Sequence, residues 1–173
     1  SGKSTLLQVI AGSLAATEGT VDFVDQETII TPDRHFRQLA IVAPYMELVE
    51  EFTLPEMIRF HFSFKTFLKG NNPKTLLDRL GFSSIQSKPI RNFSSGMKQR
   101  VKLALAFMSN VPLLLLDEPS MNLDHEGIEW YHRLLVDLRD CRTVVICSNL
   151  LQTEASPAEM IIRVEDYKIR GTR

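Results

Sequence analysis

Residues 1–7 read SGKSTLL, and the interpretation of the whole chain begins with them. Gly2, Lys3 and Ser4 match the second half of the phosphate-binding loop G-x-x-x-x-G-K-[ST]. The first glycine of that pattern and the strand that usually feeds it are missing from the sequence. We therefore expect a chain that is truncated within the loop. A glycine-lysine-serine triplet also occurs by chance in ordinary turns, so the motif needs support from the rest of the chain.

The residues of this motif suit the binding of a nucleotide. Lys3 can place its ammonium against the β- and γ-phosphates, and Ser4 can offer its hydroxyl to magnesium. Thr5 can reach another phosphate oxygen. Residues 4–10 predict a helix whose N-terminus, with its unpaired amides and positive dipole, lies at the phosphates.

Four leucines followed by two acids support this interpretation. Residues 113–120 read LLLLDEPS and predict a buried strand that ends in Asp117 and Glu118. Open parallel sheets bind ligands at the carboxyl ends of their strands. We expect Asp117 to hold the magnesium shell and Glu118 to polarise the attacking water as general base. The alternative, a strand that ends in solvated acids before a turn, is disfavoured because both motifs occur in one chain.

A third motif lies between these two and points to a family. Residues 93–100 read FSSGMKQR. They resemble the signature motif of the ATP-binding cassette (ABC) ATPases, usually LSGGQ followed by Gln or Lys and then Arg. The resemblance implies that Ser94, Ser95 and Gly96 bind the γ-phosphate, through amides at a helix N-terminus.

This resemblance extends over nearly the whole chain and implies its fold. The fold class is α/β: a P-loop NTPase with a mostly parallel sheet flanked by helices. Residues 1–173 would form a single ABC-type ATP-binding domain that lacks its N-terminal strands, with a helical subdomain at residues 54–109. Residues 120–124, SMNLD, resemble the D-loop of the family and place Asp124 at the nucleotide.

The resemblance also implies partners. ATP and Mg²⁺ would be sandwiched between the phosphate-binding loop of one subunit and the signature motif of another, so a head-to-tail homodimer is expected. A separate membrane permease would receive the motion of the dimer. The leading function is therefore the ATP-binding and hydrolysing subunit of an ABC transporter. The alternatives are a soluble non-transport ABC ATPase acting on ribosomes or nucleic acid, and an ATP-binding regulator with weakened hydrolysis.

Two positions depart from the family pattern. Tyr45 stands where the family usually has a glutamine that touches magnesium and the attacking water. Asn149 stands where the family usually has a histidine that contacts the γ-phosphate. Asparagine can donate a hydrogen bond but cannot become cationic. Asn149 is still expected to act in catalysis, but both departures favour ATP binding over fast hydrolysis.

Composition agrees with one globular domain in a reducing compartment. The 173 residues are 44% hydrophobic and 24% charged, with a formal net charge of -1, which argues against a nucleic-acid partner. Cys141 and Cys147 give no disulfide framework. No run approaches the roughly 18 apolar residues of a membrane span. We expect a cytoplasmic protein, peripheral on the inner face of the cell membrane.

The remaining pattern predicts strands that alternate with helices. Apolar runs at residues 20–25, 38–44, 113–116 and 143–148 are typical of strands, with a hairpin and loop at 26–34. Residues 125–139 predict a helix, and residues 160–171 a final hairpin. Four phenylalanines are expected to pack within the helical subdomain: Phe60, Phe62, Phe64 and Phe67. Trp130 is expected in the core. The four histidines follow no metal-binding spacing.

Overall fold

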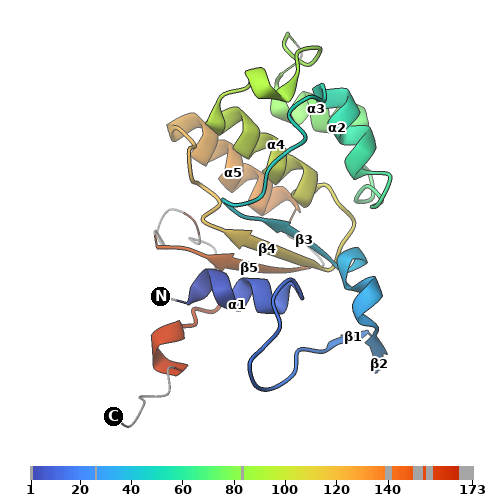
Figure 1. The fold of residues 1–173 in the computed structure, drawn as a ribbon. Helices are drawn as coiled ribbons and strands as arrows, with labels where there is room; N and C mark the ends of the chain where they lie inside the picture. Colours follow the sequence, from blue (N-terminus) through green and yellow to red (C-terminus); the bar gives the residue numbers. More distant parts are fainter. Residues whose placement is uncertain are drawn as a thin grey trace.

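Three parallel strands form the centre of the fold (Figure 1). In the computed structural model, which describes residues 2–25, 27–82, 84–138, 142–149, 154 and 158–167, they lie in the order β3-β4-β5. Strand β4 (Leu113–Asp117) pairs in parallel with β3 (Leu39–Val42) on one side and β5 (Thr143–Cys147) on the other. The unbroken leucine run suits this middle strand, because both of its faces are covered.

Helices cover both faces of this sheet. Helix α1 (Lys3–Ile10) lies on one face, while α4 (Ser95–Phe107) and α5 (His125–Leu138) lie on the other (Figure 1). Leu115 packs in a small cluster with residues of α1 and β3, whereas Leu114 and Leu116 belong to the large cluster with α4 and α5. Alternate side chains of a strand point to opposite faces, so the run supplies both layers of the core. The predicted α/β fold is confirmed.

Two short helices follow strand β3. Helix α2 (Leu54–His61) begins at a capping box in which Glu56 accepts a hydrogen bond from the backbone amide of Thr53 (2.8 Å). Helix α3 (Pro73–Leu80) is capped by Asn72 and ends at Gly81, whose φ of 70° suits a glycine after a helix. Both helices lie in the segment 54–109. That this segment is a separate helical subdomain stays a prediction.

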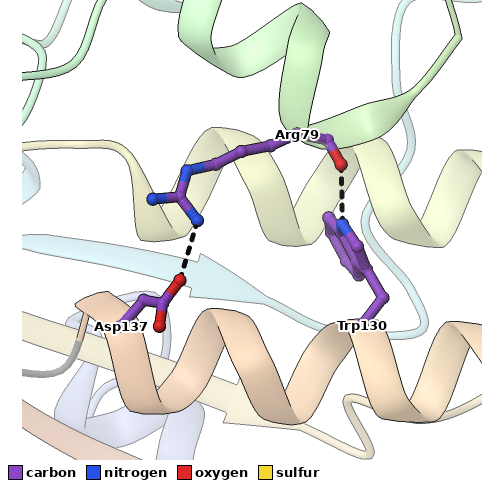
Figure 2. A network of polar contacts seen from close by, with 3 residues as sticks. All are labelled: Arg79, Trp130 and Asp137. Atoms are coloured by element: carbon purple, nitrogen blue, oxygen red, sulfur yellow. Dashed lines mark hydrogen bonds and ion pairs between the residues drawn. The ribbon is translucent and has the colours of Figure 1, made fainter.

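Polar and aromatic contacts join helices α3, α4 and α5. Figure 2 shows the Trp130 indole of α5 donating to the carbonyl of Arg79 (2.8 Å), while the Arg79 guanidinium pairs with Asp137 (3.1 Å). The guanidinium of Arg100, on α4, lies 4.9 Å from the centre of the Trp130 ring and 5.1 Å from that of Phe82. A cation between two aromatic faces is attracted to both. Trp130 is in the core, as predicted.

A second, small sheet lies beside the main one. Strands β1 (Phe23–Asp25) and β2 (Thr28–Ile30) form an antiparallel hairpin, as the sequence predicts. A 3-10 helix, η1 (Pro32–Arg37), leads from it to β3, and a shorter one, η2 (Ile90–Asn92), precedes α4.

Two sequence predictions are wrong. The first is the C-terminal hairpin at residues 160–171, since Val164–Tyr167 form a 3-10 helix, η3, in place of a strand. The rest of that predicted hairpin, residues 168–171, lies outside the described part, as do Arg139 and Cys141. Phe60 and Phe64 do not pack inside: their exposed fractions are 44% and 59%. Helix α2 buries Leu54, Met57 and Ile58, and Phe60 lies off that buried face, while Phe64 follows the helix. Within the described part, no helix has the length and apolar character needed to cross a membrane.

Candidate functional site

The carboxyl ends of β4 and β5 bring the predicted site residues together. The register pairs Asp117 with Cys147, and the amide of Glu118 donates to the carbonyl of Cys147 (2.8 Å). Asn149 follows β5 by two residues. The N-terminus of α1 reaches the same edge, because the Cys147 thiol lies 3.5 Å from the carbonyl of Lys3. Residues far apart in the sequence therefore form one site.

A chain of hydrogen bonds connects three of these side chains. The Lys3 ammonium donates to Oδ1 of Asn149 (2.7 Å), and Nδ2 of Asn149 donates to Oε1 of Glu118 (2.7 Å). The backbone amide of Asn149 also donates to the same carboxylate oxygen (3.2 Å). An amide side chain offers one acceptor and one donor group, which here match a cation and an anion. Asn149 thus links Lys3 to Glu118.

Glu118 occupies an unusual backbone and electrostatic position. Its φ is 46°, in the left-handed region that residues other than glycine seldom adopt. Partial burial raises the pKa of the Glu118 carboxyl, and the negative charges of Glu154 and Asp117 act in the same direction. The backbone hydrogen bond from Asn149 and the charge of Lys3 oppose this rise. Strained conformations and raised pKa values are both typical of functional sites.

Asp117 and Ser4 have the chemistry that Mg²⁺ requires. Asp117 is only 3% exposed, and among the described residues no side chain donates a hydrogen bond to its carboxylate. Ser4 lies exposed in the first turn of α1. Both offer oxygen ligands, and Mg²⁺ in nucleotide sites is usually held by one or two protein oxygens together with phosphates. Among the described residues, no group of three or more His, Cys, Asp or Glu side chains is arranged to hold a metal ion.

The start of α1 is open to an anion. Gly2 precedes the helix with a φ of 85°, and no side chain caps its first turn. Gly2, Ser4 and Thr5 are exposed. Unpaired amides at a helix N-terminus, next to the ammonium of Lys3, favour binding of phosphate.

The signature segment lies apart from the start of α1. Ser94 caps α4 by accepting from the amide of Met97 (3.2 Å), while Ser95 is exposed. Gly96 packs so tightly that a Cβ there would lie 2.8 Å from the carbonyl oxygen of Asn122. No hydrogen bond between described residues joins Ser94, Ser95 or Gly96 to α1. One chain therefore carries two separate candidate phosphate-binding surfaces.

Asp124 has a structural contact in this chain. Its Oδ1 accepts from the amide of Gly127 (2.8 Å) near the start of α5. Asp124 is otherwise exposed, so a contact with nucleotide stays a prediction.

Three polar side chains that support the site were missed by the sequence analysis. Gln99 on α4 is 3% exposed and donates to the carbonyl of Pro119 (2.8 Å). Lys102, also on α4, donates to the carbonyl of Met46 (3.2 Å) and so holds the loop that carries the exposed Tyr45. A polar residue on the apolar face of a predicted helix was a usable signal for Gln99. The third residue, Glu154, has no such signal in the sequence, because it belongs to no recognisable motif or periodic pattern.

Comparisons with known proteins agree with this geometry. The ABC transporter family model matches residues 1–121. The lantibiotic transport ATP-binding protein SrtF of Streptococcus pyogenes is 28% identical over 174 residues, which cover 97% of this chain and 72% of SrtF. The lipoprotein-releasing system ATP-binding protein LolD 2 of Rhodospirillum rubrum is 33% identical over 160 residues, 86% of this chain and 69% of LolD 2.

A solved structure agrees as well. The ATP-binding subunit of an ABC transporter superposes with a TM-score of 0.76 and 25% identity, over 88% of this chain and 65% of that one. The match of motifs, of strand-end geometry and of the family model leads to one conclusion: the chain belongs to the ABC transporter family and has the fold of its ATP-binding subunits.

Proposed function

We propose that this chain binds and hydrolyses ATP as the ATP-binding subunit of a transporter. The observation that carries the proposal is the chain of hydrogen bonds from Lys3 through Asn149 to Glu118, next to the buried carboxylate of Asp117. A cation for phosphate, a carboxylate for metal and a carboxylate for water meet at one sheet edge. Phosphoryl transfer needs these three functions and little else from the protein.

Each residue has a distinct role in this proposal. Lys3 and the exposed amides that follow Gly2 bind the β- and γ-phosphates, with Thr5 as a further contact. Ser4 and Asp117 hold Mg²⁺, which neutralises phosphate charge when bound. Glu118 orients the attacking water and accepts its proton. Asn149 orients the Glu118 carboxylate in the absence of nucleotide. When the Lys3 ammonium moves from Asn149 to the phosphates, Asn149 releases its hydrogen bond to Glu118.

The separation of the two phosphate-binding surfaces supports a head-to-tail homodimer. The start of α4, where Ser94 and Ser95 are exposed and Gly96 is half-buried, would meet the γ-phosphate held by a second copy. Asp124 would lie near the same nucleotide across the interface. Gly96 also matters for packing within the single chain, because a Cβ at this position would lie 2.8 Å from the carbonyl oxygen of Asn122.

Exposed aromatic side chains support a permease as the partner. Phe60 and Phe64 on and after α2 contact each other edge to face, with ring centres 5.4 Å apart. The Phe52 ring lies 5.6 Å from that of Phe60. Aromatic residues are enriched at protein interfaces. We propose that this aromatic surface (Phe52, Phe60 and Phe64), at and just before the predicted helical subdomain, receives a permease, and that the subunit is peripheral on the inner face of the cell membrane.

Phe64→Ser tests the transporter proposal against the soluble alternative. Loss of an interface aromatic often costs 2 kcal/mol or more, so we expect transport by the assembled complex in vesicles to fall about tenfold or more. ATP binding by the isolated subunit should not change. Tyr167→Ser, which alters an exposed aromatic ring on η3, serves as the control. Unchanged transport in Phe64→Ser would remove the aromatic surface as the permease contact.

Asn149→His tests whether hydrolysis is weakened in this chain. A cationic histidine offers a hydrogen bond roughly twice as strong as that of a neutral amide. If the difference of about 1 kcal/mol acts only in the transition state, ATP turnover should rise about fivefold with little change in affinity. Steady-state phosphate release and equilibrium ATP binding are the measurements, with Asn110→His as a surface control. Equal or lower turnover would show that Asn149 is matched to Lys3 and Glu118.

A further inference from the structure

Glu154 is a buried acid whose side chain contacts the turn that follows β4. Its exposed fraction is 1%. Oε1 accepts a hydrogen bond from the amide of Ser120 (2.8 Å) and another from the Ser120 hydroxyl. The backbone carbonyl of Glu154 accepts from the Tyr131 hydroxyl of α5 (2.9 Å). The backbone of Glu154 is therefore joined to α5, while its carboxylate is bound to the turn.

The turn itself has an unfavourable backbone. Glu118 and Asn122 both have positive φ angles, 46° and 66°. Such conformations persist only where surrounding contacts impose them. Gln99 supplies one such contact from α4, through the carbonyl of Pro119. Glu154 supplies another, through both donors of Ser120.

We propose that Glu154 is a positioning residue for Glu118. By fixing Ser120, it holds the backbone of residues 118–122 so that the Glu118 carboxylate stays within reach of Asn149. The proposal rests on the proposed hydrolysis of ATP at Glu118. In this proposal Glu154 contacts neither the nucleotide nor the attacking water and acts on Glu118 only through the turn.

One observation argues that the carboxylate serves more than packing. Oε2 of Glu154 is buried without a hydrogen-bond partner among the described residues. Buried unsatisfied polar atoms are uncommon and destabilising, so packing alone does not account for a carboxylate at this position. Its other oxygen, Oε1, binds both donors of Ser120, and Glu154 is thus linked to Glu118 through the turn.

Three variants of the full chain test this role. Glu154→Ala removes the acceptor of Ser120, and since small misplacements of catalytic groups can cost about 100-fold, kcat should fall at least tenfold. The KM and Kd for ATP should stay within about threefold, because no contact with phosphate is altered. Glu154→Gln keeps an oxygen acceptor and should restore most of kcat. Ser120→Ala, which removes only the hydroxyl donor and preserves the amide, should fall between the two.

Tyr131→Phe separates positioning from stability. It removes the hydrogen bond to the Glu154 backbone but leaves the contact with Ser120, so it should lower Tm without lowering kcat. An equal loss of kcat in Tyr131→Phe would overturn the proposal, and so would full activity in Glu154→Ala.

A crystal structure of Glu154→Ala without nucleotide provides a readout that does not require hydrolysis. The Glu118 carboxylate should move away from Nδ2 of Asn149. An unchanged Glu118 would overturn the positioning role even if the parent hydrolyses ATP. Absence of turnover in the parent, with Glu118 displaced in the variant, would instead overturn the proposed hydrolysis alone.

Discussion

Glu118→Gln is expected to lower ATP turnover by about 10² to 10⁴-fold, the usual contribution of a general base. The amide keeps the size of the side chain but cannot accept the proton of the attacking water. ATP affinity should stay close to that of the parent, because Lys3 and the start of α1 are unaltered. The variant should therefore accumulate as an ATP-bound dimer, which size-exclusion chromatography with light scattering would detect.

A surface glutamate provides the control for this change. Glu126 lies exposed in the first turn of α5, and Glu126→Gln should have parental turnover and no trapped dimer. Turnover at the parental rate in Glu118→Gln would contradict the general-base assignment.

Lys3→Ala is expected to remove most of the affinity for ATP. Hydrogen bonds to charged groups contribute about 1.5 to 3 kcal/mol each, so the loss of the ammonium should raise Kd by roughly 10 to 150-fold. Equilibrium binding of a fluorescent ATP analogue measures this change. The thermal midpoint should hardly move, because the Lys3 contact with Asn149 is exposed to solvent.

Lys69→Ala is the matched control for the lost charge, since Lys69 is exposed and lies between α2 and α3. If Lys3→Ala bound ATP as tightly as Lys69→Ala, the phosphate-binding role of residues 2–5 would be wrong.

The fold could be predicted from the sequence because its central signals are local. The leucine run before Asp117 has the length of a strand and is apolar on both faces, which suits only a covered strand. Ser94 predicts the start of a helix because its side chain can cap it, and the structure confirms that cap. The predicted C-terminal hairpin is wrong because a short apolar run resembles a strand in sequence whether or not a partner strand is available. Residues 160–162 form such a run, but they pair with no strand among the described residues.

The candidate site was predictable only where a motif defines it. Lys3, Asp117 and Glu118 belong to recognisable patterns, and strand-end geometry predicts that they meet. The bridging role of Asn149 could not be predicted, because it depends on the distances between three side chains far apart in sequence. Glu154 contacts Ser120 across 34 positions, and no periodicity connects them.

Helix α4 contacts neighbouring parts of the fold along almost its whole length, and these contacts restrict how its sequence can change over evolution. Its apolar side chains fill the large core cluster, while Lys98 pairs with Glu50 and Arg100 donates to the carbonyl of Leu80. Gln99 and Lys102 hold two further loops. A substitution on almost any face of this helix removes a contact to a different neighbour. We expect sequence drift among orthologues to spare α4 and to accumulate on α5, whose outer face carries exposed residues such as His125 and Val136.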